Sequence, residues 1–185
     1  MIRFFDVFIS ISILIIFLPV LILIPILIII FDGSPVIFKQ VRVGLNGKKF
    51  NIFKFRTMKN TFYKNEILRL TFLGKILRKT SLDEMPQFIN ILKNEMSIVG
   101  PRPLPEKIEK KIKNTLRKKR RTILPGITGM SQVNFTGKNR TLSEKINLDI
   151  KLVNNYNLYN YFKIMLNTPI ILIIKFFKNK SSIVK

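Results

Sequence analysis

The feature that most constrains this chain is a long uncharged apolar run near its N-terminus. Residues 7–31 read VFISISILIIFLPVLILIPILIIIF and carry no charged side chain over 25 positions. As one straight helix this run would be about 37 Å long, enough for the roughly 30 Å hydrocarbon core of a bilayer. It is too long for a cleavable signal peptide, and no small-x-small cleavage site follows it. We therefore expect a membrane-embedded segment over residues 1–31 and a second domain over residues 32–185.

Two prolines inside the run bear on whether it crosses the membrane. Pro19 lies in its middle and Pro25 follows one and a half turns later; each frees the carbonyl four residues before it, which favours a kink. A kinked spanning helix and a re-entrant helix that returns to the same leaflet both satisfy this pattern. The strongly basic body follows directly, so the positive-inside tendency places residues 32–185 in the cytoplasm.

The charge of the chain excludes several kinds of chemistry. Of 33 Lys and Arg and ten Asp and Glu, only Arg3 and Asp6 lie within the first 31 residues, so the body carries the whole net charge of +23. Such a body attracts nucleic acid, anionic lipid or phosphorylated small molecules. Because Cys and His are absent, disulfides, thiolate sites and a histidine base or zinc ligand are excluded. Catalysis must use carboxylates, Lys, Arg, hydroxyls or a cation with oxygen ligands.

Residue periodicity predicts an α+β body. Apolar and basic residues alternate around Asn46-Gly47, which predicts a β-hairpin formed by residues 36–43 and 49–55. A helix is predicted over residues 61–79, with Ile67, Leu68, Leu70, Leu73, Ile76 and Leu77 facing inward. A second helix, opened by Ser81 or Asp83, is predicted to turn inward Met85, Phe88, Ile89, Ile91 and Leu92.

Two further helices are predicted nearer the C-terminus. Residues 106–121, EKIEKKIKNTLRKKRR, place apolar side chains four apart among bases. This predicts one basic amphipathic helix, which could be solvated, contact nucleic acid or lie on anionic lipid headgroups. Beside a membrane segment the lipid is favoured, and the absence of aromatic stacking platforms argues against RNA. Residues 156–180 are apolar but interrupted by Lys163, Pro169 and Lys175, which favours an interfacial over a spanning helix.

The stretch TSLDEMPQFIN places two carboxylates side by side in a basic chain. Ser81-x-x-Glu84 fits a capping box, and Pro86 suits a first helical turn, which puts Asp83 near a helix N-cap. Capping is favoured by this stretch alone; the alternative is a nucleophile with an assisting carboxylate. The following SIVGPRPLP surrounds Arg102 with prolines, which predicts either a plain turn or a guanidinium held toward a phosphate.

Four motifs together resemble a known family. KFRTM, SLDEMPQFIN, MSIVGPRP and PGITGMSQVN, in this order behind the apolar segment, resemble the bacterial sugar transferase family of small monotopic phosphoglycosyl transferases. The similarity covers essentially the whole chain. It implies a re-entrant membrane helix, a mostly helical catalytic domain with a small β-hairpin and interfacial amphipathic helices, on the cytoplasmic face of a bacterial inner membrane. It also implies transfer of a sugar 1-phosphate from a UDP-sugar to polyprenyl phosphate, with release of UMP and dependence on Mg²⁺.

The resemblance also implies residue roles. Asp83 is similar to the family's nucleophile, which forms an aspartyl-phosphosugar intermediate, and it is the expected metal ligand; Glu84 would position groups or handle the proton. We expect the surrounding cations to keep Asp83 ionised. The residues expected to bind substrate phosphate are Arg102, Arg78, Lys54 and Arg56. Those expected in a nucleotide-sugar loop are Thr128, Gln132, Lys138 and Arg140.

Three departures from the family pattern are visible. Leu18 precedes Pro19 where relatives often have Ser, and Met130 replaces an aromatic residue. The stretch after it is longer by two residues, so either Lys138 or Arg140 stands for the usual Arg.

The competing interpretations are a non-enzymatic basic adaptor at the membrane surface and a degenerate scaffold. A homo-oligomer is compatible with the sequence, a nucleic-acid partner is not expected, and the sugar is not identified.

Overall fold

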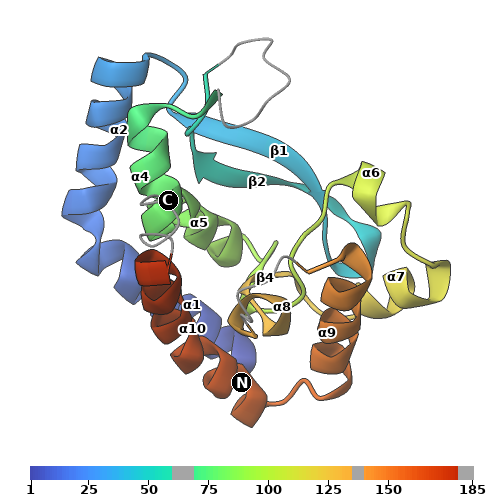
Figure 1. Ribbon diagram of the computed structural model, residues 1–185. Helices are drawn as coiled ribbons and strands as arrows, with labels where there is room; N and C mark the ends of the chain where they lie inside the picture. Colours follow the sequence, from blue (N-terminus) through green and yellow to red (C-terminus); the bar gives the residue numbers. More distant parts are fainter. Residues whose placement is uncertain (60–68, 135–139, 179–185) are drawn as a thin grey trace.

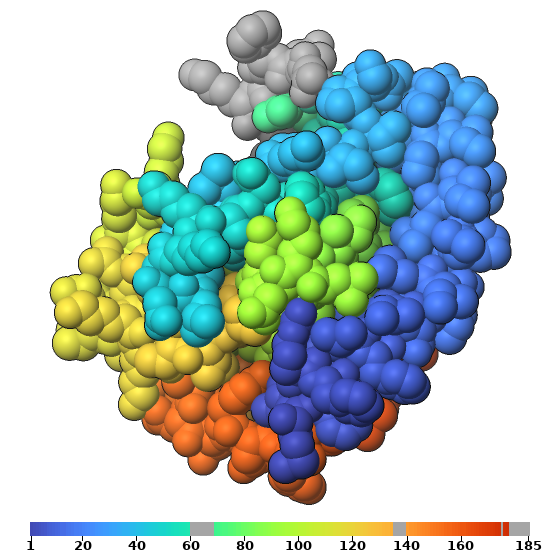
Figure 2. Space-filling model, turned by 180° about the vertical axis from the view of Figure 1, so that it is seen from behind, coloured from blue at the N-terminus to red at the C-terminus, as the bar shows by residue number. Residues whose placement is uncertain are grey.

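The computed structural model describes residues 1–59, 69–134 and 140–178 (Figure 1). Long apolar helices and a basic helical segment lie on opposite sides of a small α+β body, as the views in Figures 1 and 2 both show. The mixture of helices with two two-stranded sheets confirms the expected fold class. On the apolar side lie α1 (Ile2–Ile16), α2 (Leu18–Asp32) and α10 (Leu158–Lys178).

The N-terminal segment is a bent pair of helices. Helices α1 and α2 meet at Phe17 with an angle of 63° between them. The bend lies two residues before Pro19, which occupies the first turn of α2, where its missing N–H removes no helical hydrogen bond. Among the described residues, no single helix has both the length and the apolarity needed to span a membrane; α1 and α2 reach them only as a bent pair.

The predicted hairpin is confirmed. Strand β1 (Ile37–Val43) pairs antiparallel with β2 (Lys49–Phe55), with Val43 opposite Lys49. The connection is a 3₁₀ turn, η1 (Leu45–Gly47), in which Asn46 and Gly47 have φ of 51° and 83°, as the Asn-Gly signal requires. Phe50 and Ile52 are buried on one face of β2, and Phe55 is buried at its end on the other face.

A second, parallel sheet lies in the middle of the body. Strand β3 (Ser97–Val99) pairs with β4 (Gly126–Thr128). A Cβ at Gly126 would lie 2.0 Å from the backbone nitrogen of Gly100, so the two chains approach closely only because this residue is glycine. This close approach places the loop that follows β3 beside the start of the PGITG motif.

The predicted helix over residues 61–79 is wrong as one continuous element. Residues 60–68, which include Ile67 and Leu68, lie outside the described residues. Leu70 forms a bridge with Met58, and α4 (Phe72–Thr80) begins only after Thr71, whose Oγ1 accepts a hydrogen bond from Gly74 N. Leu73 packs against the core and Leu77 is buried, but Ile76 is 45% exposed. A capping threonine and a bridge therefore interrupt the apolar period.

The single basic helix predicted over residues 106–121 is also wrong. The segment forms two short helices, α6 (Glu106–Glu109) and α7 (Asn114–Arg120), which contact β1 and α9 (Leu142–Asn154) respectively. Buried ionic contacts of Glu109 and Arg120 orient the segment instead of an apolar stripe, and Ile108 is exposed. It lies across the molecule from α1 and α2 (Figures 1 and 2). Its contact with anionic lipid stays a prediction.

Helix α1 is joined to the body through a buried carboxylate. Asp6 Oδ1 accepts hydrogen bonds from Ser97 Oγ, Ile98 N and Tyr161 Oη at 3.0, 2.8 and 2.8 Å. Phe5 and Phe162 pack edge to face beside this network, with ring centroids 4.9 Å apart. These contacts fix α1, β3 and α10 relative to one another, which places the loop after β3.

Candidate active site

The adjacent carboxylates lie on a tight turn between two helices. Asp83 and Glu84 belong to the 3₁₀ turn η2 (Leu82–Glu84), which follows Ser81 in a left-handed conformation with φ of 60°. Helix α5 (Gln87–Leu92) starts only after Pro86, and the Ser81 side chain makes no capping hydrogen bond. The predicted capping box is therefore wrong, and Asp83 lies within the 3₁₀ turn that precedes Pro86, the N-cap of α5.

The predicted inward face of α5 is partly correct. Met85, Phe88 and Ile91 are buried. Ile89 and Leu92, in contrast, are 45% and 37% exposed. The helix has only six residues, so it buries a single narrow stripe and holds the preceding turn against the core.

Glu84 is paired with two cations from distant parts of the chain. Its Oε1 lies 2.5 Å from Lys54 Nζ in β2 and 2.7 Å from Arg102 Nη2 in the loop after β3. Burial opposes ionisation of Glu84, but the charges and hydrogen bonds of Arg102 and Lys54 outweigh it and lower the pKa of Glu84 to about 2. Glu84 is therefore a permanent anion that holds two basic side chains in the site.

Asp83 is the opposite case. Its side chain is 7% exposed, and within the described part of the chain no hydrogen bond or ion pair to it is found. Burial, and then the neighbouring charge of Glu84, raise the pKa of Asp83 to about 6, against the opposing charges of Lys54, Arg78 and Arg102. The effect of the cations that we expected to keep Asp83 ionised is outweighed by burial and by the charge of Glu84. At neutral pH Asp83 is still mostly a carboxylate, without a partner.

The other predicted phosphate-binding cations divide into two groups. Arg78 is exposed, its Nε donates to Thr57 Oγ1 at 2.9 Å, and its charge acts on Asp83. Arg56, in contrast, is 8% exposed, and its guanidinium donates to the carbonyls of Asp32, Gly33 and Ser34 in the turn after α2. The structure therefore gives Arg56 a contact with the N-terminal segment and brings Arg78 to the carboxylates.

Arg42 is a cation that the sequence reading missed. Its Nη1 donates to Pro103 O at 3.2 Å, and burial together with the nearby charge of Arg102 lowers its pKa. The strand register places Arg42 on the same hairpin face as Lys54. Arg42 pairs with Phe50, which lies four residues before Lys54, and side chains alternate between the two faces of a strand. That alternation was the available signal.

The contacts of the described residues in the predicted nucleotide-sugar loop are with α10 and within the loop itself. Thr128 is buried, and its Oγ1 lies 2.8 Å from Thr168 Oγ1 in α10. Gln132, in α8 (Met130–Val133), donates to Ile127 O at 3.2 Å, and Arg140 Nη1 donates to Ser131 O at 3.4 Å. Lys138 lies outside the described residues. The choice between Lys138 and Arg140 therefore stays open.

The adjacent carboxylates could supply one or two ligands to a metal ion. Among the described residues no group of three or more Asp, Glu, His or Cys side chains could hold a metal ion. Glu84 Oε1 is engaged by two cations, whereas the Asp83 carboxylate is free. Mg²⁺ commonly binds one or two carboxylates, waters and substrate phosphates. The donor set around Asp83 fits this pattern of binding.

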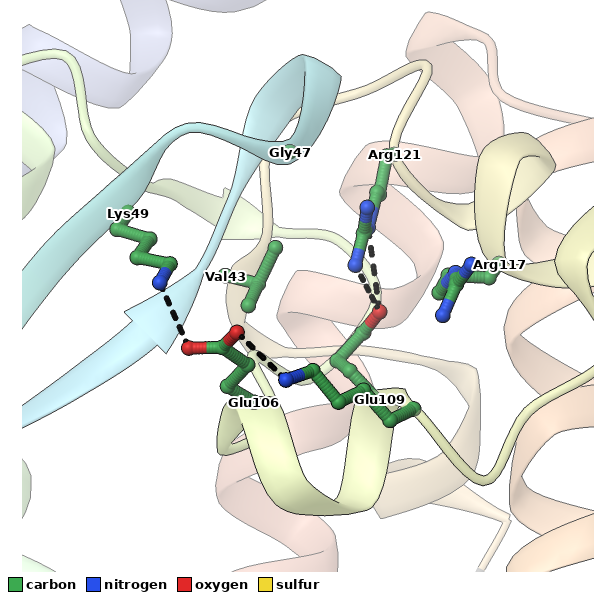
Figure 3. A pocket seen from close by; sticks show the side chains of 8 residues that line it. Val43, Gly47, Lys49, Glu106, Glu109, Arg117 and Arg121 are labelled. Atoms are coloured by element: carbon green, nitrogen blue, oxygen red, sulfur yellow. Dashed lines mark hydrogen bonds and ion pairs between the residues drawn. The ribbon is translucent and has the colours of Figure 1, made fainter.

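A basic pocket of about 250 Å³ lies at the end of the hairpin, away from these carboxylates (Figure 3). Glu106 bridges Lys49 and Lys110 at 2.7 and 3.2 Å, and Glu109 pairs with Arg121 at 2.8 Å. Each acid in the pocket is engaged by its cations, so this network packs the hairpin against α6 and α7.

Comparisons with known proteins place the chain in one family. A family model described as bacterial sugar transferase matches residues 1–175. An uncharacterized sugar transferase, EpsL of Bacillus subtilis, is 43% identical over 72% of this chain and 67% of its own length. The UDP-glucose:undecaprenyl-phosphate glucose-1-phosphate transferase of Klebsiella pneumoniae is 35% identical over 97% of this chain and 41% of its own length.

A third relative is matched over a smaller share of its own length. Galactosyl transferase CpsE of Streptococcus agalactiae is 38% identical over 74% of this chain, and the match spans 34% of that protein. The chain thus corresponds to about a third to two thirds of the length of these relatives. The match over residues 1–175 includes the bent helix pair, the Asp83–Glu84 turn and the loop that carries Arg102. The chain belongs to the bacterial sugar transferase family.

Proposed function

We propose that this protein is a phosphoglycosyl transferase, which moves a sugar 1-phosphate from a UDP-sugar to polyprenyl phosphate and releases UMP. The carrying observation is a buried carboxylate without a partner, Asp83, beside a second carboxylate that holds two cations. The names of two relatives, each a UDP-glucose:undecaprenyl-phosphate glucose-1-phosphate transferase, support the substrate classes.

The first step forms an acyl phosphate. An oxygen of Asp83 attacks the phosphorus that bears the sugar, an Asp83–phosphorus bond forms, and the bond from that phosphorus to UMP breaks. In the second step an oxygen of polyprenyl phosphate attacks the same phosphorus and releases the Asp83 carboxylate. Both leaving groups depart as anions, so neither step requires a proton from the protein.

Glu84 acts by positioning in this scheme. With a pKa of about 2 it is a poor proton acceptor at neutral pH. Its ion pairs hold Lys54 and Arg102 where they meet the phosphate oxygens, and Arg78 and Arg42 add positive charge nearby. Asp83 would hold Mg²⁺ together with the substrate phosphates, and the ion would neutralise charge on the diphosphate.

The apolar side of the molecule supports a membrane arrangement. Large apolar side chains of α1, α2 and α10 are exposed there, among them Phe8, Ile15, Leu23, Leu166 and Phe177. Exposed apolar patches of this kind mark interaction surfaces. A re-entrant α1–α2 pair in the cytoplasmic leaflet of the bacterial inner membrane covers them with lipid. The site then meets a soluble donor and a lipid acceptor at the same surface.

The test is UMP release by the purified protein in lipid nanodiscs. We expect at least one member of a panel of UDP-sugars to be turned over. UMP release should continue over multiple turnovers only when undecaprenyl phosphate and Mg²⁺ are both present. Asp83→Asn should abolish turnover, whereas Lys118→Gln, an exposed change in α7, should retain it. Full turnover by Asp83→Asn would exclude the proposed chemistry.

A further inference from the structure

Arg120, at the end of α7, is a buried cation that reaches the back of the candidate site. It is 4% exposed, and its guanidinium has partners on three elements. Nη1 lies 2.5 Å from Glu109 Oε1 in α6, and Nε lies 3.1 Å from Asp149 Oδ2 in α9. Nη2 donates to the backbone carbonyl of Arg102 at 2.8 Å. Arg120 therefore touches the residue that pairs with Glu84.

The loop over residues 101–105 is held through its carbonyls. Three of these five residues are prolines, which have no N–H to donate, so the loop cannot be fixed by a strand-like ladder. Every carbonyl accepts a hydrogen bond instead. The donors, in chain order, are Gly126 N, Arg120 Nη2, Arg42 Nη1, Val43 N, and for the last carbonyl both Ile108 N and Glu109 N.

Arg102 is thus fixed at both of its ends. Its side chain pairs with Glu84 at 2.7 Å, and its carbonyl accepts a hydrogen bond from Arg120 at 2.8 Å. The planar guanidinium of Arg120 is needed for this, because it serves two carboxylates and one carbonyl at once, which an ammonium group cannot reproduce. Neither Glu84 nor Asp83 is among its contacts.

We propose that Arg120 is a positioning residue for the transfer reaction, which sets the direction of the Arg102 guanidinium by holding the Arg102 carbonyl. This inference rests on the proposed function, since Arg102 is taken to bind substrate phosphate. The competing reading is purely structural: Arg120 neutralises Glu109 and Asp149 and stabilises the fold without directing Arg102.

The two readings differ in a double-mutant cycle. Arg120→Lys keeps the positive charge but removes the planar set of guanidinium N–H donors. We expect kcat/KM for the UDP-sugar to fall roughly tenfold. In an Arg102→Ala background the same change should alter kcat/KM by less than about twofold, because the group that Arg120 directs is gone. Arg121→Lys is the matched control: Arg121 pairs with the same Glu109 carboxylate but not with the Arg102 carbonyl.

Asp149→Asn provides a second variant if Arg120→Lys does not fold. It keeps the shape of the side chain and weakens one of the contacts that hold Arg120. We expect the same non-additivity with Arg102→Ala in kcat/KM, while the fall in unfolding temperature should be equal in both backgrounds. Equal losses of kcat/KM in both backgrounds, or an Arg121→Lys effect as large as that of Arg120→Lys, would overturn the inference. Absence of UMP release by the unaltered protein would overturn the proposed function with it.

Discussion

The Asp6 carboxylate in α1 accepts a hydrogen bond from the Tyr161 hydroxyl in α10 at 2.8 Å, across 155 residues of sequence. Both side chains are essentially inaccessible to solvent. Asp6 is the only acid among residues 1–31. Its carboxylate accepts hydrogen bonds from residues of β3 and α10. The apolar helices are therefore fastened to the same strand that leads into the Arg102 loop.

Tyr161→Phe should lower the stability of the protein. The change removes one hydrogen bond to a buried carboxylate and leaves ring packing in place, so we expect a loss of about 2 kcal/mol, or roughly 4–8 °C in Tm. The measurement is thermal unfolding in nanodiscs. Tyr159→Phe, at a residue that is 72% exposed in the same helix, is the control and should leave Tm unchanged. Equal Tm values for the two variants would contradict this assignment.

Asp83→Asn should stabilise the protein while it removes activity. The folded-state pKa of Asp83, about 6, lies above its ordinary value of 3.8, so the folded state disfavours the ionised form. The penalty is absent below about pH 4 and complete above about pH 6, where it corresponds to about 3 kcal/mol at most. Unfolding measured at pH 4 and pH 7.5 should show a stability gain only at the higher pH.

Glu84→Gln provides the opposite case. The pKa of Glu84 is lowered to about 2, so its ionised form stabilises the fold, and this contribution is lost only as the pH falls from about 4.5 through about 2. At pH 7.5 the substitution should therefore lower the unfolding temperature. A gain from Glu84→Gln, or a loss from Asp83→Asn, would show that the two environments are assigned wrongly.

The activity should follow the ionisation of Asp83. Below about pH 6 the nucleophile becomes protonated, so kcat/KM should fall about tenfold for each pH unit. In Glu84→Gln the neighbouring anion is gone and Lys54 and Arg102 are released, both of which lower the pKa of Asp83. The acidic limb of the pH profile should then move to lower pH. An unmoved limb would mean that another group controls it.

Arg56 and Lys54 should respond differently to the same substitution. Arg56→Gln removes contacts to the carbonyls after α2, so we expect a stability loss of about 2 kcal/mol and an unchanged KM for the UDP-sugar. Lys54→Gln removes a cation from the site, so we expect KM to rise and kcat to fall. Unfolding curves and steady-state kinetics of both variants separate the two roles; a raised KM in Arg56→Gln would return that residue to the site.

The parts of the fold that could be predicted depend on local signals. The hairpin needs only alternation and Asn46-Gly47, and the acid pair is adjacent in the chain. The pKa difference between Asp83 and Glu84 could not be predicted, because it depends on Lys54 and Arg102, which lie 30 and 18 residues from Glu84.

The division of the basic segment and the contacts of Arg56 both depend on long-range polar partners. Residues 106–121 have a helical apolar period, but Glu109 and Arg120 are drawn inward by each other and by Asp149, which divides the segment. Arg56 lies in a basic motif like Lys54, yet it is turned toward the carbonyls after α2. The spacing of apolar residues along the chain does not indicate which distant polar groups these residues contact.

The central claim is that Asp83 becomes covalently bonded to phosphorus in each catalytic cycle. The direct measurement is intact-peptide mass spectrometry of protein incubated with a UDP-sugar that it turns over, in the absence of polyprenyl phosphate. The account predicts a phosphosugar adduct on the peptide that contains Asp83, released when undecaprenyl phosphate is added and absent from Asp83→Asn. Protein of proven activity that never carries the adduct on this residue would contradict it.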